Sequence, residues 1–104
     1  MTTASIDRLI CVVPPRLTSD AQRPFLQAAE CALGTAAALG AAEVTLDLAR
    51  VERTDAAGLG LLVMAHRRAE SLGVRLVLGG VTGELHGLLV VAGLDRLFTF
   101  AGDA

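Results

Sequence analysis

Short apolar runs alternate with longer stretches of helical periodicity along this chain of 104 residues, and this alternation constrains the fold more than any other feature. These runs predict β-strands, because they are dominated by apolar and β-branched side chains and are ended by turn residues. They cover residues 9–13, 44–48, 74–78 and 97–100. Helical patterns fill the intervals between them. A strand–helix repeat of this kind predicts right-handed crossovers and a largely parallel sheet.

The three expected helices carry their own start and stop signals. Ser19 and Gln22 have the spacing of a capping box, and glycines follow the periodic stretches where a helix can end. The expected starts are between Asp20 and Pro24, at Asp55 and at Thr82, and the expected ends are Gly40, Gly73 and Gly93. The expected inner faces are Leu26, Ala29, Leu33 and Ala37, then Gly58, Leu61, Leu62, Ala65, Ala69 and Leu72, then Leu85, Leu88, Leu89 and Ala92.

Composition indicates one folded domain over residues 1–104 and argues against nucleic acid as a partner. Hydrophobic residues make up 53% of the chain and charged residues 19%, which is typical of a globular domain. Aromatic residues are only 3%, so the stacking rings that single-stranded nucleic acid needs are scarce. The 9 basic residues are outnumbered by 11 acidic ones, so a basic groove is not expected either.

The two cysteines and the chain's N-terminus bear on location and cofactors. Cys11 and Cys31 form neither a CxxC motif nor a Cys/His cluster, so we expect no metal and no cofactor. Buried thiols in a reducing compartment are the simpler interpretation, although a disulfide between them stays open. Residues 1–8 lack the pattern of a signal peptide, and the apolar stretches 59–65 and 88–92 are too short to span a bilayer. We therefore expect a cytoplasmic protein with no membrane insertion.

Three segments together resemble the STAS family, the domain of anti-sigma-factor antagonists. Val44-Thr45-Leu46-Asp47-Leu48 is similar to the family's strand of the form VVLDL. Residues 54–62, Thr-Asp-Ala-Ala-Gly-Leu-Gly-Leu-Leu, resemble its turn into a helix, and residues 93–98, Gly-Leu-Asp-Arg-Leu-Phe, resemble its ending. The order and spacing of the three segments also fit. The resemblance covers residues 43–100 well and the first 40 residues loosely.

The resemblance implies a fold, a partner and a switch. The fold would be α/β, a small sheet of about four mostly parallel strands flanked by three helices. The partner would be an anti-sigma factor that is itself a serine kinase, or another regulatory protein, and the domain would be no enzyme. In the family, the residue after the motif's Asp is the phosphorylated serine, and the added charge breaks the complex.

Alanine stands at that position here, as Ala56, so phosphorylation cannot occur there. The domain could bind constitutively, could serve as a scaffold or transporter-complex subunit, or could carry an engineered replacement. Thr54, one residue before Asp55, is a conceivable substitute acceptor.

The candidate partner-binding site is the turn and the first half of the second helix. Asp55 is expected to cap that helix. Gly58 and Gly60 are costly in a helix, which indicates either close packing on a strand or close approach by a partner. Apolar side chains off the inner stripe are expected to be partly exposed and to contact the partner, unless the helix is broadly buried. The candidate residues are Thr54, Asp55, Ala56, Ala57, Gly58, Leu59, Val63 and Met64.

Two other features leave alternatives open. His66 and His86 are isolated, so no catalytic set is visible in the sequence. The loop 79–83 follows a strand and opens a helix, which keeps a small ligand- or nucleotide-binding domain as an alternative function, although it matches neither common phosphate motif. The family usually opens with two paired strands, and only one is evident before Pro14 and Pro15. An uncovered sheet edge or helix face could then drive homodimer formation.

Overall fold

Four parallel strands form the main sheet of the structure, a computed structural model that describes residues 8–101. The strands are β1 (Arg8–Val12), β3 (Glu43–Asp47), β5 (Arg75–Gly79) and β6 (Thr99–Phe100), in the order β1-β3-β5-β6. The helices are α1 (Gln22–Leu39), α2 (Ala56–Leu72) and α3 (Gly83–Val91). This arrangement confirms the predicted α/β class. The last strand begins at Thr99, two residues later than its apolar run indicated.

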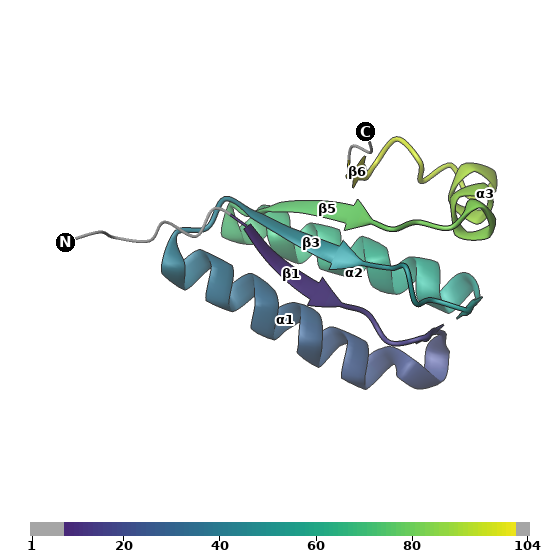
Figure 1. Cartoon of the computed structure of the whole chain (residues 1–104), viewed down its shortest axis with the longest axis horizontal. Helices are drawn as coiled ribbons and strands as arrows, with labels where there is room; N and C mark the ends of the chain where they lie inside the picture. The colour runs from purple at the N-terminus through teal and green to yellow at the C-terminus, as the bar shows by residue number, and fades with distance from the viewer. Residues whose placement is uncertain (1–7, 102–104) are drawn as a thin grey trace.

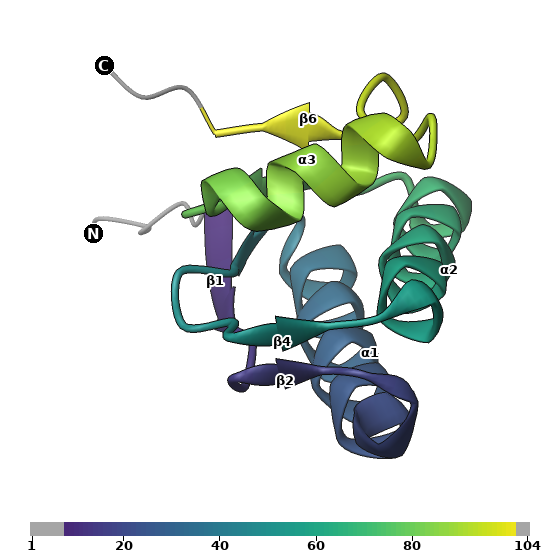
Figure 2. The same cartoon turned by 90° about the vertical axis from the view of Figure 1, so that its right-hand side faces the viewer.

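The helices are placed unequally around the sheet. Helices α1 and α2 lie side by side on one face, whereas α3 sits beyond the ends to which β1, β3 and β5 point (Figures 1 and 2). Leucines from the central strands and both long helices fill the space between the two layers, and Leu33, Leu46 and Leu62 are fully buried there. None of the helices within residues 8–101 is both long enough and apolar enough to cross a membrane.

Helix α1 begins at Gln22, within the predicted range of Asp20 to Pro24, but its cap and its inner face differ from the prediction. No side-chain bond caps it at Ala21, so the capping box expected at Ser19 and Gln22 is wrong. Ser19 instead opens a short 3-10 helix, η1 (Ser19–Ala21). The buried face is Phe25, Ala29, Leu33 and Ala36, whereas Leu26 is half-buried and Ala37 is exposed. The face is turned by about one residue, because a helix rich in alanine offers little apolar contrast and Phe25 sets its orientation.

Helix α2 follows its predicted face and α3 departs from it. In α2, Leu72 is half-buried and the other predicted positions are buried. In α3 only Leu85 and Leu89 are buried, and Leu88 and Ala92 are exposed, so the prediction for those two residues is wrong. The nine residues of α3 pack one narrow stripe against the domain and leave the rest in solvent.

The segment after β1 forms a second, two-stranded sheet that the sequence pattern did not predict. Strand β2 (Arg16–Leu17) pairs in parallel with β4 (Arg53–Thr54), and the two lie side by side next to the start of α2 (Figure 2). The carbonyl of Pro15 accepts hydrogen bonds from the backbone N–H groups of Glu52 and Arg53, at 2.7 and 3.2 Å. Pro14 and Pro15 thus end one strand and lead the chain to the region that precedes α2. The first seven residues, including any further N-terminal strand, lie outside the described range.

Candidate functional site

Asp55 caps α2 as the sequence predicts. Its Oδ1 accepts a hydrogen bond from the backbone N–H of Gly58 at 2.9 Å, and its Oδ2 accepts one from the N–H of Ser19 at 3.5 Å. Its own N–H donates to the carbonyl of Leu17 at 3.4 Å. A single aspartate therefore joins the start of the helix to the segment that contains β2 and η1, and its carboxylate complements the helix's positive end.

Glycine occupies two positions near the start of α2 for different reasons. A Cβ on Gly58 would lie 1.8 Å from the carbonyl oxygen of Leu17, so the helix approaches β2 too closely for any side chain at this position. This contact is the helix-on-strand packing that was one of the two interpretations. A Cβ on Gly60 would meet nothing within 4 Å, and the residue is exposed, so no contact inside the domain requires a glycine there. Close approach by a partner remains the interpretation for Gly60.

The apolar side chains off the inner stripe of α2 do not form one patch. Leu59 and Val63 are half-buried and pack against the core, whereas Met64 is 47% exposed. Met64 lies about 100° round the helix axis from Val63. Arg68 lies one helical turn after Met64, on the same flank of α2, and bonds to Glu30 of α1. Met64 is therefore the most accessible of the three apolar side chains for an incoming protein.

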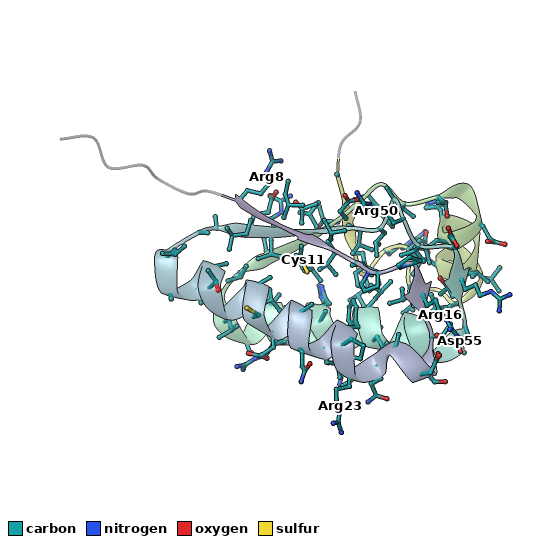
Figure 3. The ribbon with its side chains drawn as sticks, turned by 60° about the horizontal axis from the view of Figure 1, so that its bottom comes forward. Arg8, Cys11, Arg16, Arg23, Arg50 and Asp55 are labelled. Atoms are coloured by element: carbon teal, nitrogen blue, oxygen red, sulfur yellow. The ribbon has the colours of Figure 1, made fainter. Side chains whose placement is uncertain are left out.

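Ala56 and Ala57 lie at the first helical positions of α2 and are exposed, as is Asp55. Thr54 is half-buried, pairs with Leu17 across the small sheet and lines a groove next to the helix start. The predicted residues at positions 54–57 are thus brought together at one end of the molecule. Figure 3 shows Asp55 at this end, near Arg16 of β2.

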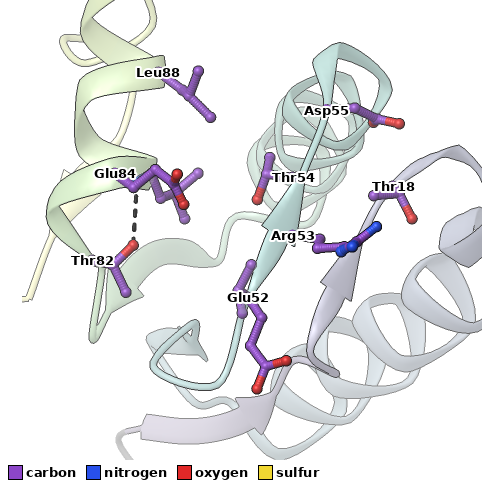
Figure 4. Close-up of a pocket in the computed structure, with 10 residues that line it drawn as sticks. Thr18, Glu52, Arg53, Thr54, Asp55, Thr82, Glu84 and Leu88 are labelled. Carbon is purple, nitrogen blue, oxygen red and sulfur yellow. Dashed lines mark hydrogen bonds between the residues drawn. The ribbon is translucent and has the colours of Figure 1, made fainter.

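An open groove of about 560 Å³ separates the turn before α2 from the start of α3 (Figure 4). Thr82 caps α3 by accepting a hydrogen bond from the N–H of Leu85 at 3.2 Å. The walls are Thr18, Val51, Glu52, Arg53, Thr54, Asp55, Thr82, Glu84, Leu85 and Leu88. Only Thr54 and Asp55 of this set belong to the predicted site. The α3 residues were missed because nothing in the sequence shows that α3 folds back beside the turn.

The groove combines an apolar lining with charged walls. Val51 and Leu85 are buried, and Leu88 is 38% exposed. Three carboxylates and one guanidinium surround these side chains, from Glu52, Asp55, Glu84 and Arg53. Small molecules usually bind in deeper, more enclosed pockets. An open surface of mixed polarity suits a side chain or short segment of another protein better.

The two histidines lie away from this groove. His66 packs edge-on against Phe98, with ring centres 5.6 Å apart, and its Nδ1 is buried without a hydrogen-bond partner. His66 is therefore part of the packing between α2 and the chain before β6. His86 is exposed and makes a similar edge contact with Phe100. Within residues 8–101, no three His, Cys, Asp or Glu side chains gather as a metal ion would require.

Comparisons with known proteins agree on the fold. A search of curated proteins found no match. A sulfate transporter family protein from Wolinella succinogenes has a TM-score of 0.72 at 19% identity, over 95% of this chain and 80% of that one. A crystal structure from Thermotoga maritima, described as a putative anti-sigma factor antagonist, has a TM-score of 0.72 at 21% identity, over 90% and 80%. The unphosphorylated anti-sigma factor antagonist SpoIIAA has a TM-score of 0.61 at 13% identity, over 99% and 86%.

The family assignment rests on a match to most of the chain. The model of the family described as "Mlab, STAS domain" matches residues 13–99, from the residue after β1 to the first residue of β6. That range includes the small sheet, the capped turn before α2 and both walls of the groove. The chain therefore belongs to the Mlab STAS-domain family.

Proposed function

We propose that this domain is a non-catalytic, cytoplasmic docking module that binds a regulatory protein through the exposed start of α2. The observation that carries the proposal is the contrast at this helix end. Asp55, Ala56, Ala57 and Gly60 are exposed, while the N–H of Asp55 donates to the carbonyl of Leu17 in β2 and Gly58 packs against that same carbonyl. Small side chains on a firmly held helix end let a partner's backbone approach closely.

The partner that the anti-sigma-factor resemblance favours is a serine-kinase-type anti-sigma factor. Two of the similar structures are described as anti-sigma factor antagonists. The resemblance implies that Ala56 stands at the family's phosphorylated position, and alanine offers no hydroxyl, so we propose that the complex is not broken by phosphorylation at this residue. Thr54 lines the groove wall and is a substitute acceptor only if a kinase reaches that wall.

A second candidate is a subunit of a transport complex. The family description and the similarity to a sulfate transporter family protein support it. Ala56 also fits this candidate, because a structural subunit needs no phosphorylation switch. Both candidates use the same face of the domain. They differ in the partner, which would be a kinase-like protein in the first and a transport ATPase in the second.

The test places a negative charge where a phosphate would lie. In Ala56→Glu the carboxylate sits at the positive end of α2, so the variant should fold with unchanged or slightly higher stability. It should nevertheless lose most partner binding, because the charge lies in the contact face. Ala42→Glu is the matched control, since Ala42 is exposed just before β3, at the other end of the domain.

Wild-type and variant domains would be immobilised and exposed to host extract, and bound proteins identified by mass spectrometry. A partner retained by the wild type and by Ala42→Glu but lost from Ala56→Glu supports the proposal. Its identity as a kinase-like protein or a transport ATPase separates the two candidates. Binding of the same partner by Ala56→Glu at full strength would refute the proposed face. Met64→Asp, compared in the same way, tests whether the contact extends along α2 as far as Met64.

A further inference from the structure

Strand β1 is an unprotected edge of the sheet. It is the first strand in the order β1-β3-β5-β6, and among residues 8–101 no strand pairs with its outer side. Edge strands are commonly protected by a charge or a proline within the strand. Here the one charge of β1 is Arg8 at its first position, residues 9–12 are all apolar, and Ile10 and Val12 are 64% and 51% exposed. An apolar edge of this kind favours pairing with another strand.

The backbone of β1 offers hydrogen-bonding groups at this edge. The N–H of Val13 donates to the carbonyl of Asp47 in β3 at 3.0 Å, so the backbone groups of Val13 point toward β3. Backbone groups of successive residues in a parallel strand point alternately to its two sides. Arg8, Ile10 and Val12 therefore direct their N–H and C=O groups outward, and the same residues carry the exposed side chains of the strand.

Helix α1 extends this uncharged surface below the edge. Glu30 on one flank of α1 bonds to Arg68 of α2, so the opposite flank lies on the outer side, under β1 (Figure 1). Helical spacing places small or apolar residues on that outer flank. They are Ala28, Cys31, Ala32, Thr35 and Leu39. Cys11 of β1 faces α1 (Figure 3), and burial raises the pKa of its thiol, with a smaller contribution from nearby Cys31.

We propose that two copies of this chain pair their β1 strands in antiparallel fashion about a two-fold axis at Ile10. The two sheets would join into one, and the two α1 helices would lie side by side beneath the joint. In this register Ile10 faces Ile10 of the second copy, and Arg8 faces Val12. All three outward residues of each strand then find backbone partners, whereas a shift of two residues would leave some of them unpaired.

The small residues below the strands leave room for a second copy as the occupant. Paired strands lie about 4.8 Å apart, whereas packed helices need about 8 Å or more, so helices beneath adjoining edge strands are crowded. Alanines 28 and 32 allow that close approach. The surface carries no unpaired charge that would repel its own copy, because Arg8 lies 4.0 Å from Glu43 of its own chain. A strongly charged partner would find no ion pair here.

This interface is separate from the proposed docking face at the start of α2. Its area is modest, since it consists of one five-residue strand edge and one flank of an 18-residue helix. Stable dimers usually bury about 800 Å² on each partner, so we expect micromolar rather than tighter association.

Cysteine cross-linking tests the pairing and its register. Ile10→Cys, in a chain that also carries Cys11→Ser and Cys31→Ser, should form a disulfide-linked dimer under mild oxidation, because facing residues lie within disulfide range. Val12→Cys in the same background is the matched control. Its two copies would lie about 13 Å apart along the paired strands, so it should stay uncrosslinked.

Ile10→Pro tests the same proposal without a thiol. Proline removes an outward N–H that the β1–β3 ladder does not use, so the variant should keep its far-ultraviolet circular dichroism. Sedimentation should show a dimer for the wild type at high micromolar concentration and at least a tenfold weaker one for Ile10→Pro. A wild type that stays monomeric, equal cross-linking of both cysteine variants, or an unchanged dimer in Ile10→Pro would each overturn the proposal.

Discussion

Helices α2 and α3 begin alike and end up in different environments. Each follows a strand or turn, and each is capped by a side-chain oxygen, from Asp55 in one and Thr82 in the other. Helix α2 then buries five residues against the sheet and α1, whereas α3 buries two. Local capping therefore starts both helices, and tertiary packing decides how much each contributes to stability.

The sparsely packed helix carries an unusual amount of exposed apolar surface. Leu88, Val90 and Val91 are 38%, 48% and 87% exposed. Substitutions on such a surface should change the free energy of unfolding little. The surface is also available for contact with another protein. Helix α2 is therefore the firmly packed side of the candidate site and α3 the sparsely packed side. Three measurements test this contrast.

The largest expected effect comes from core truncation. Leu62→Ala in α2 removes a fully buried side chain and should lower the free energy of unfolding by about 2–5 kcal/mol. Val91→Ala in α3 should change it by less than about 0.5 kcal/mol. Urea unfolding followed by circular dichroism measures both. Equal losses in the two variants would mean that α3 is packed as firmly as α2.

A methyl group added to each helix separates them again. Gly58→Ala forces a Cβ against the carbonyl of Leu17 and should cost about 1–3 kcal/mol. Gly87→Ala in α3 meets nothing within 4 Å and should gain up to about 1 kcal/mol, since alanine favours the helix. The same urea titrations give both values. A neutral Gly58→Ala would show that β2 moves freely away from α2.

The smallest effect concerns the ion pair that ties α2 to α1, for which α3 has no counterpart among the described residues. Arg68 Nε lies 2.9 Å from Glu30 Oε1, and hydrogen bonding to Arg68 holds the pKa of Glu30 below its ordinary 4.5. A lowered pKa in the folded state means that the pair stabilises above about that pH and that its contribution is lost as the pH falls.

Because both side chains are exposed, the contribution is small and salt-sensitive. Thermal melts of the wild type and Glu30→Gln at low ionic strength measure it. We expect the wild type to melt slightly higher near neutral pH, and the two midpoints to converge as the pH falls below the ordinary pKa of a glutamate. A gap that widens on acidification would contradict this assignment.

The elements that the sequence predicted correctly are those whose signals are local. Periodicity and glycines located α1, α2 and the central strands, and the spacing of Asp55 and Gly58 predicted the cap. The face of α3 could not be predicted in the same way, because Leu88, Leu89, Val90 and Val91 are apolar all round the helix. Which of them is buried depends on what packs against α3.

The parts that the sequence did not reveal depend on contacts between distant segments. Strands β2 and β4 have two residues each, too few for a pattern, and exist because Pro15 and Leu17 bond to residues far along the chain, Glu52, Arg53 and Asp55. The groove follows from the same long-range arrangement. Thr82, Glu84 and Leu88 line it only because α3 lies beside the turn before α2.

The contact between Gly58 and Leu17 has a consequence for recognition. Because the helix start rests directly on a neighbouring backbone, it cannot tilt without disrupting the small sheet. A protein that docks there meets a surface already in its final shape, and little conformational entropy is lost in the encounter. Recognition should therefore resemble the meeting of two rigid bodies, with specificity set by shape rather than by folding upon binding.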